Sequence, residues 1–392
     1  MKLREIITQT LRIARIEFKA MRKHPLTILI LVTAPLCGYL ILFTLMAEGL
    51  PEKLPAAIVD SDNSASSHQL VRTISALQYT RIVGHFPTFT EARKAMQRNN
   101  VYAIYYIPKG FEREVVTGRR PKLSFYINYA YLIAGSLLYK DMRTASELAL
   151  ANVGMTQFYA HGGETWQTEG VLQPIVIETH PVGNPWINYS IYLNNILFPG
   201  ILMVAVLLVT VYAIGMEVKQ RHIKRWLSMA KGNIYVALTG KLLPYTIIGM
   251  GMMCITNILL YGVLQYPCHC GIGNMIVVGV LFILAIQGLG VFIYSLVPWM
   301  RMAMSIASLW AVLSFPISGF TFPSIAMDES FQLLNNLFPL RHYYLIYANS
   351  ALLGYPLQYV LSEIGTLFVF AILPIPFLPR LKRELKMSCY VE

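Results

Sequence analysis

The pattern of apolar and polar positions divides the chain into six long apolar runs and one long alternating segment. Residues 25–47 contain no charged side chain, and about 20 apolar residues are enough to cross a bilayer as a helix. Five further runs lie near 191–215, 234–264, 275–297, 302–320 and 357–378. The pattern predicts an α-helical polytopic membrane protein with six transmembrane helices, of which 25–47 is the first and 191–378 contains the other five.

Residues 48–190 follow a different pattern, in which short alternating strands are separated by short charged helices. Strands are expected at 56–60, 80–86, 101–108 and 121–129, and helices at 64–77, 89–99, 110–118 and about 131–158. This order is typical of a small α/β domain that ends in a long helix. Leu123–Tyr139 is also apolar, but its strand-like start and the charges that follow it argue against a seventh span.

Residues 1–24 have the period of an amphipathic helix. Its apolar face is predicted to hold Leu3, Ile7, Leu11, Ala14, Phe18 and Met21. The basic residues lie mostly opposite: Arg4, Arg12, Arg15, Lys19, Arg22 and Lys23. A helix of this kind lies in the membrane interface or packs on a soluble partner. Its direct continuation into the first span favours the membrane interface, and the stretch lacks the cleavage site of a signal peptide.

The distribution of charge predicts the topology of the spans. The net charge is +12, although only 13% of the residues are charged and 55% are hydrophobic. Basic residues gather in 1–24, in 216–241, at Arg301 and in the tail 379–392, whereas 265–274 and 321–356 together hold one, Arg341. Basic connections face the cytoplasm. Both termini are therefore expected in the cytoplasm and the α/β domain outside it, and nucleic-acid binding is disfavoured.

No motif for catalysis, cofactors or metals is complete. The chain has no phosphate-binding loop with the required glycine and hydroxyl spacing, so it should not hydrolyse ATP by itself. The stretch DSDNS at 60–64 begins like a calcium loop but lacks the later Gly and Glu, so a capped strand-to-helix turn is preferred. Cys268, His269 and Cys270 are spaced too closely for a zinc site, which favours free thiols over a metal or redox role.

Polar side chains within the apolar runs are few. Glu363 lies about two turns inside the last run, where an unpaired carboxylate is costly. Two interpretations stay open: a functional intramembrane carboxylate, or an interfacial one beside Tyr359. The amides of Asn194, Asn195, Asn257 and Gln287 either line a path or bond neighbouring helices, and the second role is preferred.

Four stretches resemble the permease subunit of an ABC exporter of type-2 architecture with a large extracytoplasmic domain. AAIVDSDNSASSHQLVRTI (56–74) and FTEARKAMQRNNVYAIYYIPKGFEREVVTGRRPKLSFYIN (89–128) are similar to the outer domain of that family. GMEVKQRHIKRWLSMAKGNIYVALTGKLLPY (215–245) is similar to its cytoplasmic coupling loop, placed here at 216–233, and 318–347 to its outer re-entrant segment. The Gly-Thr that often follows the coupling glutamate is replaced around 221–223.

The resemblance implies a function and a set of partners. The function is transport of a hydrophobic or amphipathic substrate, such as a drug or lipid, out of the cytoplasm or inner membrane of a bacterium. The partners are a cytoplasmic ABC ATPase, a second permease, membrane lipid and a periplasmic adaptor, with no cofactor. The competing interpretation is a non-transport receptor or anchor whose outer domain binds a ligand.

The resemblance also assigns roles to residues. For ATPase coupling it indicates Glu217, Lys219, Arg221, Lys224, Arg225, Trp226 and Lys241, and for the interfacial helix Arg12, Arg15, Lys19 and Arg22. For a pathway or gate it indicates Pro316, Gly319, Pro323, Pro339 and Tyr344, to which the buried position adds Glu363.

Overall fold

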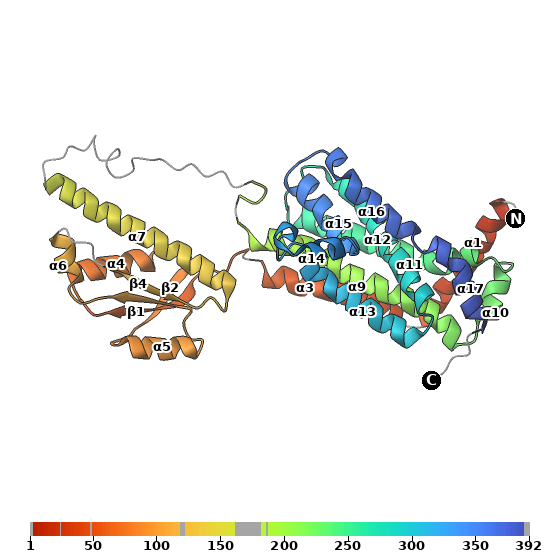
Figure 1. Cartoon of the computed structure of the whole chain (residues 1–392), viewed down its shortest axis with the longest axis horizontal. Coiled ribbons are helices and arrows are strands. Elements are labelled where there is room, and N and C mark those ends of the chain that lie inside the picture. The colour runs from red at the N-terminus through yellow and green to blue at the C-terminus, as the bar shows by residue number, and fades with distance from the viewer. Residues whose placement is uncertain are drawn as a thin grey trace. The chain divides into compact units, whose positions relative to one another are not determined.

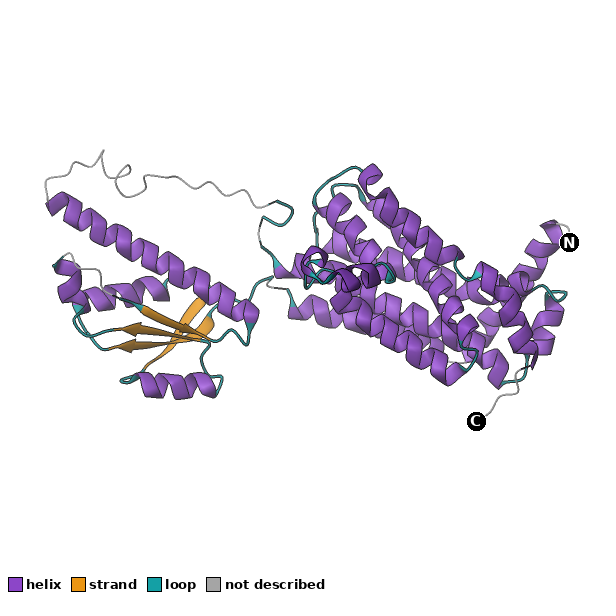
Figure 2. Ribbon diagram, in the orientation of Figure 1, coloured by secondary structure: helices purple, strands orange, loops and turns teal. Residues whose placement is uncertain are grey.

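The computed structural model describes residues 3–23, 25–47, 49–117, 122–160, 182–185 and 187–387. The chain divides into two compact units, a helical unit (residues 1–49 and 181–392) and an α/β unit (residues 50–180). Figures 1 and 2 show a helical bundle and a small sheet covered by helices. The predicted combination of a polytopic helical protein with an α/β insertion is confirmed.

The helical unit contains six helical stretches that are long and apolar enough to cross a membrane, within the part of the chain that is described. They are Pro25–Leu45 (α2, η1 and α3), Tyr189–Lys219 (α9), Ile234–Val263 (α11 and η3), Ile272–Leu296 (α12), Met300–Ile317 (α13) and Leu357–Met387 (η6, α16, η7 and α17). The last stretch stays helical beyond residue 378, where the basic tail was expected to begin, because α17 (Leu378–Met387) buries Leu378, Leu381 and Leu385.

The helices of the bundle pack closely at glycines. A Cβ atom on Gly200 of α9 would lie 2.4 Å from the Phe315 ring of α13. The tightest approach joins α12 to α16 (Leu361–Ile372), because a Cβ atom on Gly288 would lie 2.2 Å from the carbonyl oxygen of Phe370. At both positions, atoms of one helix therefore occupy the space that a side chain would fill on the next helix. Small residues allow helices to approach closely in this way.

The two ends of the bundle differ in composition. The "basic end" is formed by α1 (Leu3–Lys23), α10 (Ile223–Met229) and α17, which lie together in Figure 1. The "hairpin end" is formed by η4 (Ser324–Ala326), α14 (Glu329–Asn335), α15 (Pro339–Ile346) and the π-helical turn η5 (Tyr347–Leu352). The region expected to be re-entrant, 318–347, thus contains η4, α14 and α15, and α15 packs against α9, α12, α13 and α16.

The α/β unit is a four-stranded sheet in the order β2-β1-β3-β4. Its strands are β1 (Leu54–Asp60), β2 (Thr80–His85), β3 (Ala103–Ile107) and β4 (Ser124–Ile127), all parallel except β4, which runs antiparallel to β3. One face is covered by α4 (Ala65–Ser75), α6 (Phe111–Val116) and α7 (Leu132–Ala160), the other by α5 (Phe89–Gln97). The apolar stretch that begins at Leu123 forms β4 and the start of α7, and the final part of the expected domain, 161–181, lies outside the described residues.

Two carboxylates explain the motifs at 60–64 and 107–112. Asp62 accepts hydrogen bonds from the backbone N–H groups of Gly110 (2.6 Å) and Glu112 (3.0 Å) at the start of α6. Glu112 in turn accepts from the backbone N–H (3.2 Å) and hydroxyl (2.9 Å) of Ser66 at the start of α4. The side-chain hydrogen bond with Ser64 and the backbone bond from Glu112 lower the pKa of Asp62. The preferred capped turn is confirmed, since each carboxylate satisfies the free N–H groups of the other segment's helix.

Candidate coupling site

The first feature of the site is the crossing of α1 over α11 (Ile234–Asn257) at Gly240. A Cβ atom on Gly240 would lie 2.8 Å from Cβ of Ile13 and 2.9 Å from the carbonyl oxygen of Thr10. Real Cβ atoms do not approach other atoms so closely, and the carbonyl oxygen is backbone that cannot rotate away. Glycine at this position therefore allows the backbone of α1 to rest directly on α11.

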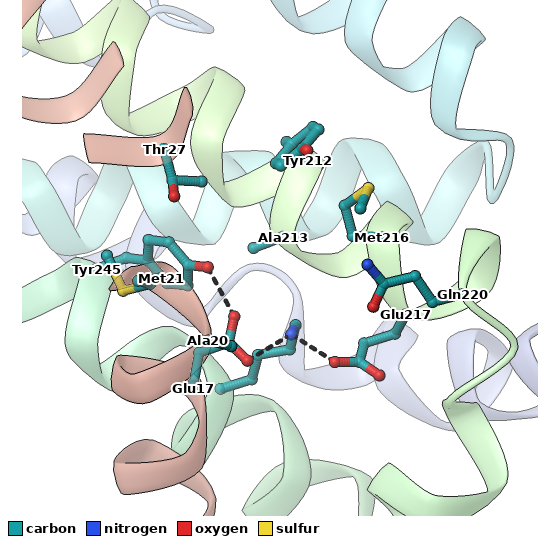
Figure 3. Close-up of a pocket in the computed structure, with 11 residues that line it drawn as sticks. Glu17, Ala20, Met21, Thr27, Tyr212, Ala213, Met216, Glu217, Gln220 and Tyr245 are labelled. Atoms are coloured by element: carbon teal, nitrogen blue, oxygen red, sulfur yellow. Dashed lines mark hydrogen bonds and ion pairs between the residues drawn. The ribbon is translucent and has the colours of Figure 1, made fainter. Parts of the chain in front are cut away.

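The next residue, Lys241, joins three helices through one ammonium group. Its Nζ lies 2.8 Å from Oε2 of Glu17 on α1 and 2.6 Å from Oε1 of Glu217 on α9. The hydroxyl of Tyr245 donates to the other oxygen of Glu17 at 2.6 Å. The side chain of Lys241 is 4% exposed, and those of Glu17 and Glu217 are 13% and 15% exposed. Figure 3 shows this cluster, which we call the Lys241 cluster.

The Lys241 cluster specifies where α1 lies more than it stabilises the fold. The attraction of a buried ion pair is largely offset by the loss of hydration, whereas loss of one partner leaves an uncompensated charge. A cavity of about 60 Å³ adjoins the cluster and is lined also by Thr27, Tyr212, Met216 and Gln220. It is large enough for a few water molecules, which gives the carboxylates room to change their partners.

The short helix α10 is fixed to α11 by Trp226. Its indole Nε1 donates to the carbonyl oxygen of Ala237 at 3.1 Å, and Nζ of Lys241 lies 6.0 Å from the centroid of its rings. The residue is 2% exposed. The expected coupling loop at 216–233 is divided between two helices: α9 ends at Lys219, and α10 covers Ile223–Met229.

The seven residues expected to couple to an ATPase therefore fall into two groups. Glu217, Trp226 and Lys241 face inward and hold the helices together. Four side chains are exposed: Lys219, Arg221, Lys224 and Arg225. The exposed group forms a basic surface at the end of α9 and along α10, which we call the α10 surface.

Helix α1 has three faces, whereas the sequence pattern predicted two. Ile13, Ala14 and Met21 are buried, and of these Ala14 and Met21 belong to the expected apolar face. Ile7, Leu11 and Phe18 are 52%, 56% and 46% exposed and form an apolar stripe, on which the Arg22 guanidinium of the same helix lies 5.2 Å from the centroid of the Phe18 ring. The four expected interfacial residues are exposed beside it: Arg12, Arg15, Lys19 and Arg22. A basic face beside an uncovered apolar stripe is the arrangement of an interfacial helix.

The sequence did not indicate Glu17 or Tyr245 as members of the site. Glu17 is an acidic residue in a mostly basic helix, and it lies on the face that packs against α11. The available signal was Lys241 itself, because a lysine inside an apolar run requires a partner. Its partners lie 224 and 24 residues away, so only the packed helices identify them.

At the hairpin end, the structure gathers the residues expected to form a gate. Pro316 lies in the last turn of α13, Pro323 precedes η4, and Pro339 is the first residue of α15. Gly319 has a φ of +93°, a conformation that favours glycine. The ring of Tyr344 lies 6.3 Å from that of Phe320, whose carbonyl accepts from the hydroxyl of Tyr192. The turn after α13 is thus held by α9 and α15.

Glu363 lies in the first turn of α16 and contacts His342 of α15. The sequence had indicated Glu363 but not its partner. The structure therefore places this carboxylate in an interhelical pair.

Two thiols lie in the connection between η3 (Ile258–Val263) and α12. Cys268 and Cys270 are free. A hydrogen bond with Cys268 lowers the pKa of Cys270 to about 7. The same hydrogen bond, together with burial, raises the pKa of Cys268.

Comparison with known families agrees with this arrangement. A model described as an ABC-2 family transporter protein matches residues 25–377, and the chain belongs to that family. It is a membrane permease of an ABC transporter, a transport subunit that is not itself catalytic. Membership implies an ABC ATPase as partner, usually with a second permease. No curated protein matches the chain.

Proposed function

We propose that this permease is the membrane subunit of an ATP-driven exporter, with the α10 surface as its contact to a separate ATPase. The observation that carries the proposal is the link between this surface and the spans. The exposed basic residues belong to α10 and the end of α9, and the same segments are joined through Trp226 and Lys241 to α11 and α1.

The mechanism follows from this linkage. An ATPase that binds two conformations of the permease with different affinity shifts the population between them. A displacement of α10 moves α11, because Trp226 of α10 is bonded to α11. Helices α1 and α9 then move with α11, because Glu17 of α1 and Glu217 of α9 both bind the ammonium of Lys241. The part that moves is thus a group of four helices, α1, α9, α10 and α11.

The proposed topology places the basic end in the cytoplasm of a bacterial cell. Support comes from the clustering of α1, α10 and the strongly basic α17 at one end of the bundle. Cytoplasmic connections carry an excess of Lys and Arg. The α/β unit is then extracytoplasmic, where a periplasmic adaptor can reach it.

The proposed cargo is a hydrophobic or amphipathic molecule such as a drug or lipid. The supporting feature is the large apolar surface of the first, fifth and sixth spans. Leu40, Leu309 and Phe368 are 63%, 60% and 56% exposed. A second permease or lipid covers such surfaces, and an apolar cargo can enter between them.

The test is co-purification of the full chain with its candidate ATPase, using the charge-reversed double variant Lys224→Glu, Arg225→Glu. Both side chains are exposed, so the bundle should stay folded. We expect loss of the bound ATPase and of permease-stimulated ATP turnover. The matched control is Arg380→Glu, Arg383→Glu on α17, which carries the same charge change at the same end.

Two results would contradict the proposal. One is an ATPase that remains bound in full to the α10 variant. The other is equal loss of binding in the α17 control, which would mean that the net charge of the basic end matters and the α10 surface does not.

A further inference from the structure

His342 is buried between two hydrogen-bond acceptors. Only 3% of its side chain is exposed, and it lies in α15 at the hairpin end. Its Nε2 lies 2.9 Å from the carbonyl oxygen of Asn336, and its Nδ1 contacts a carboxylate oxygen of Glu363 on α16. Its ring also packs near Phe370 of α16, with centroids 6.2 Å apart.

The two contacts fix the number of protons at this site. A backbone carbonyl can only accept, so Nε2 must donate to Asn336. A neutral ring then presents a lone pair at Nδ1, and an ionised carboxylate opposite it would face that lone pair without a proton between them. The contact is attractive only when one more proton is present, either on Nδ1 or on the carboxyl of Glu363.

Few other charged groups face this site. Among the described residues Arg341 interacts electrostatically with Glu363, and its guanidinium Nε has no hydrogen-bond partner there. α12, which packs on α15 and α16, has no ionisable side chain except Tyr294. The charged residues of α9 and α13 lie at the other ends of those helices, beside the basic end, and η5 and η6 (Leu357–Val360) contribute only Tyr347 and Tyr359.

We propose that His342 and Glu363 form a proton-binding site that fastens α15 to the last span. The proton is taken from and returned to water, since the carboxylate is 24% exposed while the imidazole is buried. Uptake gives both ring contacts a proton between donor and acceptor, and release leaves one ring nitrogen with a lone pair against an acceptor. The hairpin end is therefore held more firmly at low pH than at high pH. This inference stands whether or not the chain is an exporter.

The first experiment compares the thermal unfolding of the purified full chain with that of Glu363→Gln across about pH 6 to 9, which extends above the unperturbed histidine pKa of about 6.5. The amide that this substitution introduces can donate to Nδ1 of His342 without binding a proton. Relative to this variant, the melting temperature of the natural chain should fall by about 2–4 °C as pH rises, the shift that corresponds to roughly 1 kcal/mol. His222→Gln, an exposed histidine beside α10, is the control and should keep the natural profile.

A second measurement needs no variant. Nitrogen NMR of the natural chain labelled at histidine shows at about pH 8 whether one ring keeps both nitrogens protonated while exposed rings are neutral. If the proton rests on the carboxyl of Glu363, the infrared band of a protonated carboxylic acid, absent in Glu363→Gln, replaces that signal. Parallel pH profiles for the natural chain and Glu363→Gln, or a neutral ring beside an ionised carboxylate, would overturn the proposal.

Discussion

Removal of the ammonium of Lys241 is the sharpest test of the Lys241 cluster. Lys241→Met keeps most of the length of the side chain and removes its charge. Two mostly buried carboxylates, Glu17 and Glu217, then face each other without a counter-ion.

The size of the effect follows from the geometry. The two carboxylate oxygens are no more than 5.4 Å apart, since the same Nζ lies 2.8 Å from one and 2.6 Å from the other. At an effective dielectric constant of about 20, their repulsion is about 3 kcal/mol. Loss of one partner of a buried ion pair costs about 3–5 kcal/mol in other proteins, which agrees. The melting temperature should fall by about 6–12 °C, at roughly 2–4 °C per kcal/mol.

The assay is thermal unfolding of the full chain in mild detergent. The double variant Glu17→Gln, Lys241→Met removes the repulsion, so it should melt above the single variant and below the natural chain. Lys219→Met, an exposed lysine at the end of α9, should change the free energy of unfolding by no more than about 0.5 kcal/mol.

The reasoning is refuted if Lys241→Met melts with the natural chain, or if adding Glu17→Gln restores nothing. Either result would mean that the carboxylates are separated by water or have moved apart, so that the cluster does not hold α1 on the bundle.

Three further outcomes are expected. Gly240→Val should lift α1 from α11 and expose it to protease, while Gly251→Ala, whose Cβ would meet no atom within 4 Å, should not. Asp141→Ala should leave the Tyr79 N–H and the Thr80 hydroxyl without their acceptor. The free energy of unfolding should fall by about 1–3 kcal/mol and hydrogen exchange in β2 should become faster; unchanged exchange would contradict this. A maleimide at about pH 7 should label Cys270 before Cys268 in the natural chain, because the lowered pKa gives Cys270 more thiolate. Equal labelling of the two thiols in the natural chain, measured by peptide mass spectrometry, would disprove it.

The elements of the fold could be predicted from the sequence because their signals are local. An uncharged run such as 25–47 and an alternating stretch such as 101–108 each contain their own evidence of span or strand. The motif around Asp62 was correctly interpreted as a capped turn. Its bond to the start of α6, 50 residues later, could not be predicted, because it depends on which strands become neighbours.

The candidate sites were predicted as residues but not as contacts. Lys241 was indicated by the family resemblance, and Glu363 because a carboxylate in an apolar run needs a partner. Their partners Glu17 and His342 come from other segments, one of them an amphipathic helix whose packed face overlaps only partly with the apolar face that the sequence pattern predicted. The sequence pattern gives the faces of a helix, and the neighbouring helices decide which face is covered.

The contact at Gly288 has a mechanical consequence. With the backbone of α16 resting on a glycine of α12, the two helices cannot slide along each other without a steric clash, and no flexible side chain lies between them to absorb the movement. The two helices therefore move as one rigid unit. Because Glu363 belongs to α16, any displacement of α12 also moves Glu363 and the hairpin end. The flexibility of the bundle must then lie in the contacts between its other helices.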